Sequence, residues 1–207
     1  MPAELTAHRA GLDGLLIDLG SIGMVHAFAA AVHAHPVSAE LTEVVPGSAS
    51  VLLIGDQSVT DSIFADLKNM ALDSSDPSDS RTVQLHIRYD GPDLTEVAQR
   101  AELTENEVIE LHISTTHSVD FLGFSPGLAY ISGCPDQISP PRRGTPRTRV
   151  HAGSVGIANG MTVIYPAQSA GGWSLIGTLQ GDPMWNLHND PPNRVQIGDQ
   201  IRFIPAD

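Results

Sequence analysis

Residues 121–181 read FLGFSPGLAYISGCPDQISPPRRGTPRTRVHAGSVGIANGMTVIYPAQSAGGWSLIGTLQG, and the fold of the chain depends on this stretch. It holds eleven of the nineteen glycines and a single acidic residue, Asp136. Glycine allows tight turns and close approach of backbone to a ligand, while proline fixes the turns between segments. Short β-prone runs alternate with these residues, which predicts a compact β structure with a shaped surface.

The same stretch carries a cluster of arginines in a proline-rich segment, PPRRGTPRTR. Arg142, Arg143, Arg147 and Arg149 are four of the eleven basic residues of the chain. The guanidinium group presents a planar fork of donors that suits carboxylate or phosphate, and the prolines stiffen the loop. Two interpretations stay open: an anion site, or a surface loop that pairs with acidic residues of this chain or of a partner protein.

The composition excludes several classes of function. The 207 residues carry a formal net charge of −13, which argues against nonspecific nucleic-acid binding and against attraction to an anionic membrane. No apolar run approaches the length of a membrane span, and the N-terminus lacks the pattern of a signal peptide. The single cysteine, Cys134, is interpreted as a packing residue rather than a catalytic thiol. We therefore expect a soluble cytoplasmic protein.

The N-terminal part of the chain alternates strand and helix patterns. Met1–Ala10 carry no pattern, and a fourth β segment, Thr82–Tyr89, follows the second helix. The order β-α-β-β-α suits a small layered α+β domain of ferredoxin-like type. The segments in question are a strand at Leu12–Leu19, a helix at Ser21–His33 with Ser21 as N-cap, strands at Leu41–Val45 and Ser50–Ile54, and a helix at Ser58–Leu72.

A short acidic segment, Asp73–Ser80 (DSSDPSDS), separates this part from the rest. Its composition is typical of a linker, although a surface loop within one domain is the alternative. We place the domain boundary so that residues 1–82 form an N-terminal domain and residues 83–207 a C-terminal domain.

The C-terminal part begins with two short helical segments, Asp93–Ala101 and Thr104–His112. Each starts with a residue that can cap a helix and has a glutamate three positions later, Glu96 and Glu107. A helical hairpin is therefore predicted near the start of a β-barrel or sandwich. Its remaining strands are predicted at Ile113–Phe121, Met161–Tyr165, Trp173–Thr178 and Val195–Ile204, the last with a turn at Gly198-Asp199.

The glycine-rich segment His151–Gly160 is a second candidate for ligand binding. It is not a P-loop, because the one lysine of the chain, Lys68, lies in a predicted helix far from it. Arginines and backbone amides would have to replace that lysine if a nucleotide binds. Tight β-turns are the alternative interpretation.

The nucleophiles and histidines give weaker signals. Ser125 and Ser154 lie outside any G-x-S-x-G motif and have no nearby base in the sequence. His112 and His117 are five residues apart, which is not the spacing of a helical zinc pair. His112 is a candidate acid or base at the end of its helix, with a structural histidine as the alternative.

Taken together, the motifs of this chain resemble those of one family. In order, they are Gly123-Phe124-Ser125-Pro126-Gly127, Tyr130, Pro141-Arg142-Arg143-Gly144-Thr145-Pro146-Arg147, Val150-His151-Ala152-Gly153-Ser154-Val155-Gly156-Ile157, Tyr165-Pro166 and Gly171-Gly172-Trp173. The family is that of the kinase inhibitor KipI, also called the B subunit of 5-oxoprolinase and allophanate hydrolase subunit 1. Two departures, Leu128-Ala129 in place of phenylalanine-proline and His151 in place of proline, bear on the identity of the substrate.

This resemblance implies an N-terminal ferredoxin-like domain and a C-terminal cyclophilin-like β-barrel. It implies pairing with a homologue of the C subunit of 5-oxoprolinase (allophanate hydrolase subunit 2), which is also cyclophilin-like, and with a third, metal-dependent component, the A subunit. It further implies the ATP-dependent opening of 5-oxoproline to glutamate, a hydrolysis of a C–N bond. The alternatives are a KipI-like inhibitor of a histidine kinase and a carboxyltransferase-type subunit.

For the enzymatic reading, we assign roles to ten residues. ATP would be a co-substrate, and its divalent metal would come from elsewhere in the complex, because acidic residues are scarce in the central stretch. Phosphorylation of the lactam oxygen needs cations that spread the phosphate charge. The predicted catalytic residues are Arg142, Arg147 and His112; the predicted binding residues are Arg143, Gly127, Tyr130, Gly153, Ser154, Gly156 and Trp173.

Overall fold

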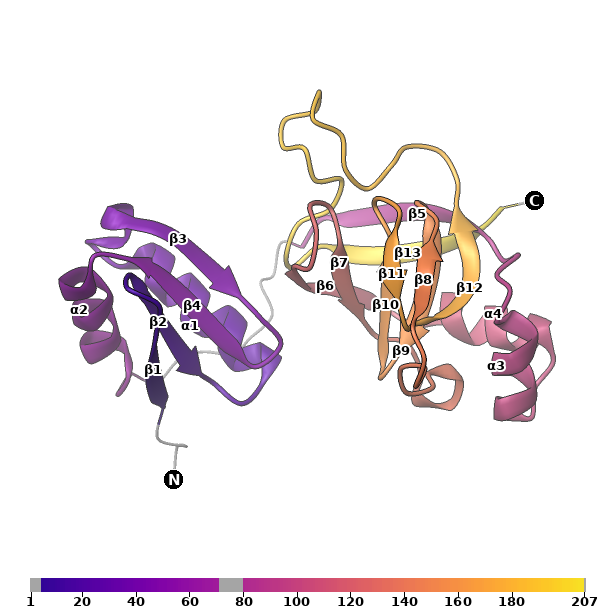
Figure 1. Ribbon diagram of the computed structural model, residues 1–207, viewed down its shortest axis with the longest axis horizontal. Coiled ribbons are helices and arrows are strands. Elements are labelled where there is room, and N and C mark those ends of the chain that lie inside the picture. The colour runs from indigo at the N-terminus through magenta and orange to yellow at the C-terminus, as the bar shows by residue number, and fades with distance from the viewer. Residues whose placement is uncertain (1–4, 71–79, 207) are drawn as a thin grey trace. The chain divides into compact units, whose positions relative to one another are not determined.

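The computed structural model describes residues 5–70 and 80–206 (Figure 1). The chain divides into two compact units, Met1–Ser78 and Asp79–Asp207, and each is described by itself. Of the predicted linker Asp73–Ser80, all but Ser80 lies outside the described residues. Thr82, placed in the N-terminal domain from the sequence, begins strand β5 of the second unit.

The first unit is a four-stranded sheet with two helices on one face. The strand order is β1-β2-β4-β3, and every neighbouring pair is antiparallel. Alternate residues of β2 and β4 share a core with α1 and α2, so both helices cover the same face. The elements are β1 (Thr6–Ala10), β2 (Gly14–Asp18), α1 (Ile22–Ala34), η1 (Ser38–Glu40), β3 (Leu41–Pro46), β4 (Ser50–Gly55) and α2 (Gln57–Leu67).

Local capping explains where the helices of this unit begin. The Ser21 hydroxyl accepts a hydrogen bond from the backbone N–H of Met24, which confirms the predicted N-cap of α1. The Asp56 carboxylate caps α2, so this helix begins one residue before the predicted start. It ends at Leu67, earlier than predicted. Strand β1 was missed because most of its side chains are exposed and give no hydrophobic alternation.

In the second unit, the described residues form a closed seven-stranded barrel in the order β10-β7-β6-β13-β5-β12-β9. The barrel prediction is thereby confirmed over the sandwich. Strand β13 runs parallel to β5 and the other pairs are antiparallel, while β8 and β11 form a separate two-stranded sheet. The elements are β5 (Thr82–Arg88), α3 (Leu94–Ala101), α4 (Glu105–Ser114), β6 (His117–Leu122), β7 (Ala129–Ser132), η2 (Asp136–Ile138), β8 (Arg147–Val150), β9 (Ser154–Ala158), β10 (Met161–Ile164), β11 (Ser169–Gly171), β12 (Ser174–Leu179) and β13 (Gln200–Pro205).

The predicted helical hairpin is α3–α4, but its two caps differ. Thr104 and Glu107 form the complete capping box at the start of α4, as predicted. Asp93 precedes α3 without a capping hydrogen bond from its side chain, so the predicted box with Glu96 is wrong. Helix α4 continues to Ser114, and the strand predicted from Ile113 therefore begins later, with β6.

The last predicted strand is shorter than its apolar run. Strand β13 begins at Gln200, and the preceding residues form a turn in which Gly198 has φ +86°. The Asp199 carboxylate accepts hydrogen bonds from the backbone N–H of Gln196 and from Arg81. Because of these bonds, residues 195–199 form a turn and do not extend β13, although Val195 is apolar and buried.

The period-2 alternation of the barrel strands creates two apolar regions. Ile131 and Ile157 belong to the core that includes the barrel interior. Their neighbours along the strands, Tyr130 and Gly156, lie on the opposite face, where Tyr130 packs with Val163 in a separate cluster. The candidate site lies on this outer face. None of the helices in the described ranges is both long and apolar enough to span a membrane.

Candidate functional site

A cavity of about 280 Å³ lies over the outer face of β7 and β10. The loop before β8 and the segment from β11 to β12 complete its walls. Its volume is near the lower end of the range for small-molecule sites, about 300–1,000 Å³. We name it the aromatic cavity. It is lined by Phe124, Leu128, Tyr130, Arg142, Arg143, Pro146, Val163, Tyr165, Ala170, Gly171, Gly172 and Trp173.

Aromatic rings form much of this lining. Tyr130 stacks on Phe121 with ring centres 4.3 Å apart, and its ring centre lies 6.0 Å from that of Trp173. Burial raises the pKa of Tyr165, and the nearby Arg142 guanidinium opposes part of this rise. The cavity therefore offers flat apolar surfaces, and the phenol of Tyr165 is neutral at neutral pH.

Arg142 supplies a cation to this cavity. Its guanidinium carbon lies 5.3 Å from the ring centre of Trp173, a distance that allows a cation–π interaction. In the described part of the chain, no ion pair or hydrogen bond engages this guanidinium. Trp173 is only 7% exposed, and its ring holds the cation in place without neutralising it. Arg142 is therefore available to an anionic ligand.

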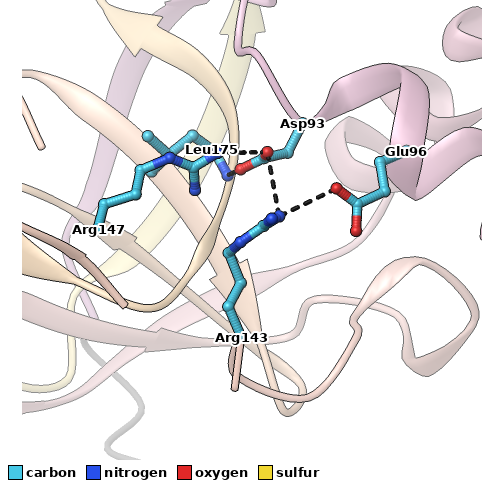
Figure 2. Close-up of polar contacts among 5 residues, drawn as sticks. All are labelled: Asp93, Glu96, Arg143, Arg147 and Leu175. Atoms are coloured by element: carbon cyan, nitrogen blue, oxygen red, sulfur yellow. Dashed lines mark hydrogen bonds and ion pairs between the residues drawn. The ribbon is translucent and has the colours of Figure 1, made fainter. Parts of the chain in front are cut away.

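Arg143 and Arg147 converge instead on a buried carboxylate (Figure 2). Asp93 is 3% exposed, and its Oδ1 accepts from Arg147 Nη2 at 2.6 Å and from Arg143 Nη1 at 3.2 Å. Its Oδ2 accepts from the backbone N–H of Leu175 at 2.7 Å. Arg143 Nη1 also donates to Glu96 at 3.0 Å.

This cluster connects α3 and the arginine loop (residues 140–149) to strand β12. The hydrogen bond to Glu96, and next the charge of Asp93, raise the pKa of Arg143. Nη1 of Arg147 is buried and makes no hydrogen bond within residues 5–70 and 80–206. Pairing with acidic residues of this chain thus accounts for Arg143 and Arg147, whereas Arg142 remains for a ligand.

Gly156 shapes the aromatic cavity without lining it. A Cβ atom at this position would lie 2.9 Å from Cβ of Trp173 and 3.5 Å from Cε2 of Tyr165. Glycine is required here because the outer face of β9 receives the Trp173 side chain.

Substitution of Gly156 by alanine is expected to displace Trp173 and to lower the stability of the barrel by about 1–3 kcal/mol, the usual cost of overpacking. Urea unfolding followed by tryptophan fluorescence would measure this change. Gly144→Ala is the matched control, since a Cβ there would meet no atom within 4 Å. Equal stability of the two variants would contradict the packing role of Gly156.

Three other predicted binding residues lie outside the lining of the aromatic cavity. Gly153 forms the turn between β8 and β9 with φ +82°, and Ser154 begins β9. Gly127, with φ +83°, is packed closely against Trp185, where a Cβ would lie 2.5 Å from the Cβ of that residue. The structure thus brings together Tyr130, Trp173 and the arginine loop, and the binding roles of the three stay predictions.

His112, the predicted acid or base, lies in the buried core and not at the aromatic cavity. Its Nδ1 is 2.8 Å from the Tyr89 hydroxyl and its Nε2 is 2.9 Å from Oγ1 of Thr162. Desolvation, and next the neighbouring His117, lower the pKa of His112 well below its usual value. The imidazole is therefore neutral at physiological pH, and its catalytic role stays a prediction.

Sequence reasoning missed three residues of this region. Phe124 and Tyr165 line the cavity, and both lie in motifs shared with the family, but their residue types alone indicated no role. Phe124 lies in the loop between β6 and β7 and is 71% exposed. Its φ of +70° is uncommon for a residue other than glycine. Asp93, the centre of the ion-pair cluster, was interpreted as a helix cap.

The residues present offer little to a metal ion. Among the residues that the structure describes, no group of three or more His, Cys, Asp or Glu side chains could hold one. Burial raises the pKa of the Cys134 thiol to about 12, so this thiol is protonated and inert at neutral pH. The aromatic cavity can bind and orient a small anion, but its described lining contains no carboxylate, imidazole or thiol.

Comparison with known proteins identifies the family of this chain. Residues 5–195 match the family described as carboxyltransferase domain, subdomain C and D. The chain belongs to this family. The sequence resemblance to the B subunit of 5-oxoprolinase is also confirmed, because the protein of that name from Bacillus subtilis (strain 168) is 31% identical over 199 residues, 88% of this chain and 82% of its own length.

Two further relatives of this carboxyltransferase-domain chain are informative. The 5-oxoprolinase B subunit of Escherichia coli O157:H7 is 42% identical over 130 residues, 61% of this chain. That match spans only 59% of the length of the E. coli protein. The crystal structure of TTHA0988 has a TM-score of 0.81 at 30% identity and matches 95% of this chain, but only 40% of that longer chain.

Proposed function

We propose that the chain is the B subunit of a 5-oxoprolinase, which opens 5-oxoproline to glutamate with hydrolysis of ATP. The observation that carries the proposal is the aromatic cavity with the unpaired Arg142 on its wall. 5-Oxoproline is a small flat ring with one carboxylate. Tyr130 and Trp173 would cover the ring, and the guanidinium of Arg142 would bind the carboxylate. The names of the relatives agree with this substrate.

The need for ATP follows from the chemistry of the lactam. Its amide is stabilised by resonance and is a poor electrophile. Attack of the lactam oxygen on the γ-phosphorus of ATP would release ADP and leave a phosphorylated imidate. Water would then add to the ring carbon, and the C–N bond would break as the ring nitrogen takes a proton, which leaves glutamyl phosphate. A second water would hydrolyse this acyl phosphate to glutamate and phosphate. Arginine side chains would stabilise the phosphate charge in the first step.

The lining of the aromatic cavity also supports a multi-subunit enzyme. A proton acceptor for the attacking water is needed, and the described lining residues include no carboxylate or imidazole. We infer that a homologue of the C subunit and a metal-dependent A subunit complete the site in the cytoplasm and supply the divalent metal that accompanies ATP. The activity, a hydrolysis of a non-peptide C–N bond, would then require the complex.

We also infer the finer fold of each unit. In the first unit, β2-α1-β3-β4-α2 follows the order of the first five elements of a ferredoxin-like domain, with β4 between β2 and β3. Strand β1 takes the edge position that the last strand holds in that fold. The closed barrel of the second unit would be cyclophilin-like.

A second candidate function is carboxyl transfer, which the description of the matched family favours. It would require a biotin carrier as partner and would leave 5-oxoproline unchanged. Incubation of the purified complex with 5-oxoproline and ATP distinguishes the two, since only the hydrolase releases glutamate and ADP in equal amounts.

Arg142→Ala is expected to lower 5-oxoproline-dependent ATP hydrolysis by the reconstituted complex about 100-fold, as loss of one charge-stabilising donor typically does. Arg149→Ala is the matched control, because this arginine belongs to the same segment but does not line the aromatic cavity. Full activity of Arg142→Ala would contradict the site. Absence of 5-oxoproline-dependent hydrolysis by the unmodified complex would reject the function itself.

A further inference from the structure

A second cavity, of about 270 Å³, adjoins the same arginines. It shares Arg142 and Arg143 with the aromatic cavity but has otherwise different walls. Helix α3 forms one wall and the loop before β8 forms another. We name it the arginine groove. It is lined by Glu96, Val97, Arg100, Pro140, Pro141, Arg142, Arg143, Gly144 and Ser174.

Positive charge dominates this groove on a chain of net charge −13. Three arginines face one carboxylate, Glu96, which pairs with Arg143. No ion pair within the described ranges engages Arg100 or Arg142. Two guanidiniums without counter-charges in one concavity produce a local positive potential that attracts anions.

The hydroxyl group of Ser174, at the start of β12, is a further hydrogen-bond donor in the arginine groove. Ser174 lines the arginine groove and is only 5% exposed, and its hydroxyl can donate a hydrogen bond to a ligand there. The backbone on the opposite side is stiffened by Pro140 and Pro141.

The groove continues beyond Arg100. A smaller cavity of about 110 Å³ shares Val97, Arg100 and Pro140 with it and reaches the residues of η2, which add one carboxylate, that of Asp136, to its lining. Arg100 therefore lies where the two cavities meet, in the last turn of α3. An extended anion, with charges several bonds apart, fits this shape better than a single compact anion.

We propose that the arginine groove binds the polyphosphate group of a nucleotide, with three donors: Arg100, Ser174 and the N–H groups of Arg142 that the carboxylate of 5-oxoproline does not engage. Guanidinium forks match phosphate oxygens, and several of them spread its charge. Arg142 would stand between the phosphates in the groove and the ring in the aromatic cavity, as transfer of a phosphoryl group to the lactam requires. The proposal rests on the proposed function for the identity of the nucleotide, ATP.

The test is isothermal titration calorimetry of the full chain with pyrophosphate, ATP and inorganic phosphate in low salt. Arg100→Gln is expected to weaken the binding of pyrophosphate and ATP about tenfold, as loss of one charge-assisted hydrogen bond does. Arg149→Gln, on an exposed position of β8 outside both cavities, is the matched control and should change affinity less than about twofold. Because Arg100 is exposed, the variant should fold, which circular dichroism verifies.

Each outcome has a clear meaning. Equal weakening by both variants would show nonspecific attraction and overturn the proposal, as would the absence of saturable binding. Binding of pyrophosphate without binding of ATP would overturn the nucleotide assignment. Binding of 5-oxoproline, measured in parallel, should be unaffected by Arg100→Gln. If the complex fails to turn over 5-oxoproline while Arg100→Gln still weakens the binding of pyrophosphate, the result would reject the 5-oxoprolinase function but support a polyphosphate site in the arginine groove.

Discussion

Replacement of Asp93 by alanine is expected to lower the free energy of unfolding of the second unit by about 3 kcal/mol, the cost of removing one partner of a buried ion pair. The carboxylate is buried and accepts three hydrogen bonds, from Arg143, Arg147 and the backbone of Leu175. Its loss would leave the Arg147 guanidinium, one nitrogen of which is already unsatisfied, without a counter-charge. The loop that carries Arg142 would lose its anchor at the same time.

Urea unfolding followed by tryptophan fluorescence measures this effect in the right unit, because Trp173 and Trp185 both belong to it. Glu96→Ala is the matched control. Its side chain is 66% exposed and, within residues 5–70 and 80–206, forms an ion pair only with Arg143, so its loss should cost less than about 1 kcal/mol. If the two variants were equally stable, the cluster would be no more than a surface ion pair.

Asp93 also shows why part of this site could not be predicted. The pattern of Asp93 and Glu96 satisfies the local rule for a capping box, and that rule depends on four consecutive positions. The true partners lie 50 to 82 residues further along the chain. Local pattern gave no sign of them, since charge pairs across such separations are set by strand pairing and not by spacing. The side chain of Thr104 bonds to Glu107, its only hydrogen-bond partner among the residues that the structure describes, and follows the local rule.

The aromatic cavity was more accessible to prediction. Tyr130, Trp173 and Arg142 were named because glycines, aromatic rings and arginines gather in one stretch, and all three line the cavity. Gly153 and Gly156 were assigned to ligand contacts for the same reason. Gly153 forms a turn, whereas Gly156 makes room for the side chain of Trp173. The sequence alone cannot distinguish these two roles from a contact with a ligand.

The barrel was predicted from short β segments and turns, but its closure and strand boundaries depend on long-range contacts. Strand β13 pairs with β5, more than a hundred residues earlier in the chain, in parallel. An apolar run such as that ending in β13 does not reveal where pairing begins. Here Asp199 determines the boundary through its bonds to Gln196 and Arg81.

Removal of the His112 imidazole is the second change expected to have a large effect. The ring is fully buried, lies 4.5 Å from the ring of Phe203 in a stacked arrangement, and contacts two hydroxyl groups, of Tyr89 and Thr162. His112→Ala would leave a cavity and two unsatisfied hydroxyls, at a cost of about 3–5 kcal/mol. His86→Ala, at an exposed position on β5, is the matched control and should change stability by less than about 0.5 kcal/mol.

His112 further makes the stability of the barrel depend on pH. Its pKa is lowered well below 6.5 in the folded protein, while in the unfolded chain it returns to about 6.5. Below that pH the unfolded state binds a proton that the folded state excludes, so stability is full above pH 6.5 and falls as the pH falls. For this group alone the loss approaches about 1.4 kcal/mol for each pH unit below 6.5 over which the folded imidazole stays neutral. His117, whose pKa is lowered chiefly by desolvation, adds to it in the same direction.

The pH dependence can be measured separately from the packing loss. His112→Gln retains hydrogen-bonding groups but cannot titrate, so its free energy of unfolding, although lower at pH 7, should fall less steeply between pH 7 and pH 5. The difference in slope between the wild-type chain and this variant isolates His112, because all other titrating groups are common to both. Parallel curves would mean that the imidazole takes up a proton inside the folded barrel, and a neutral structural role for His112 would then be untenable.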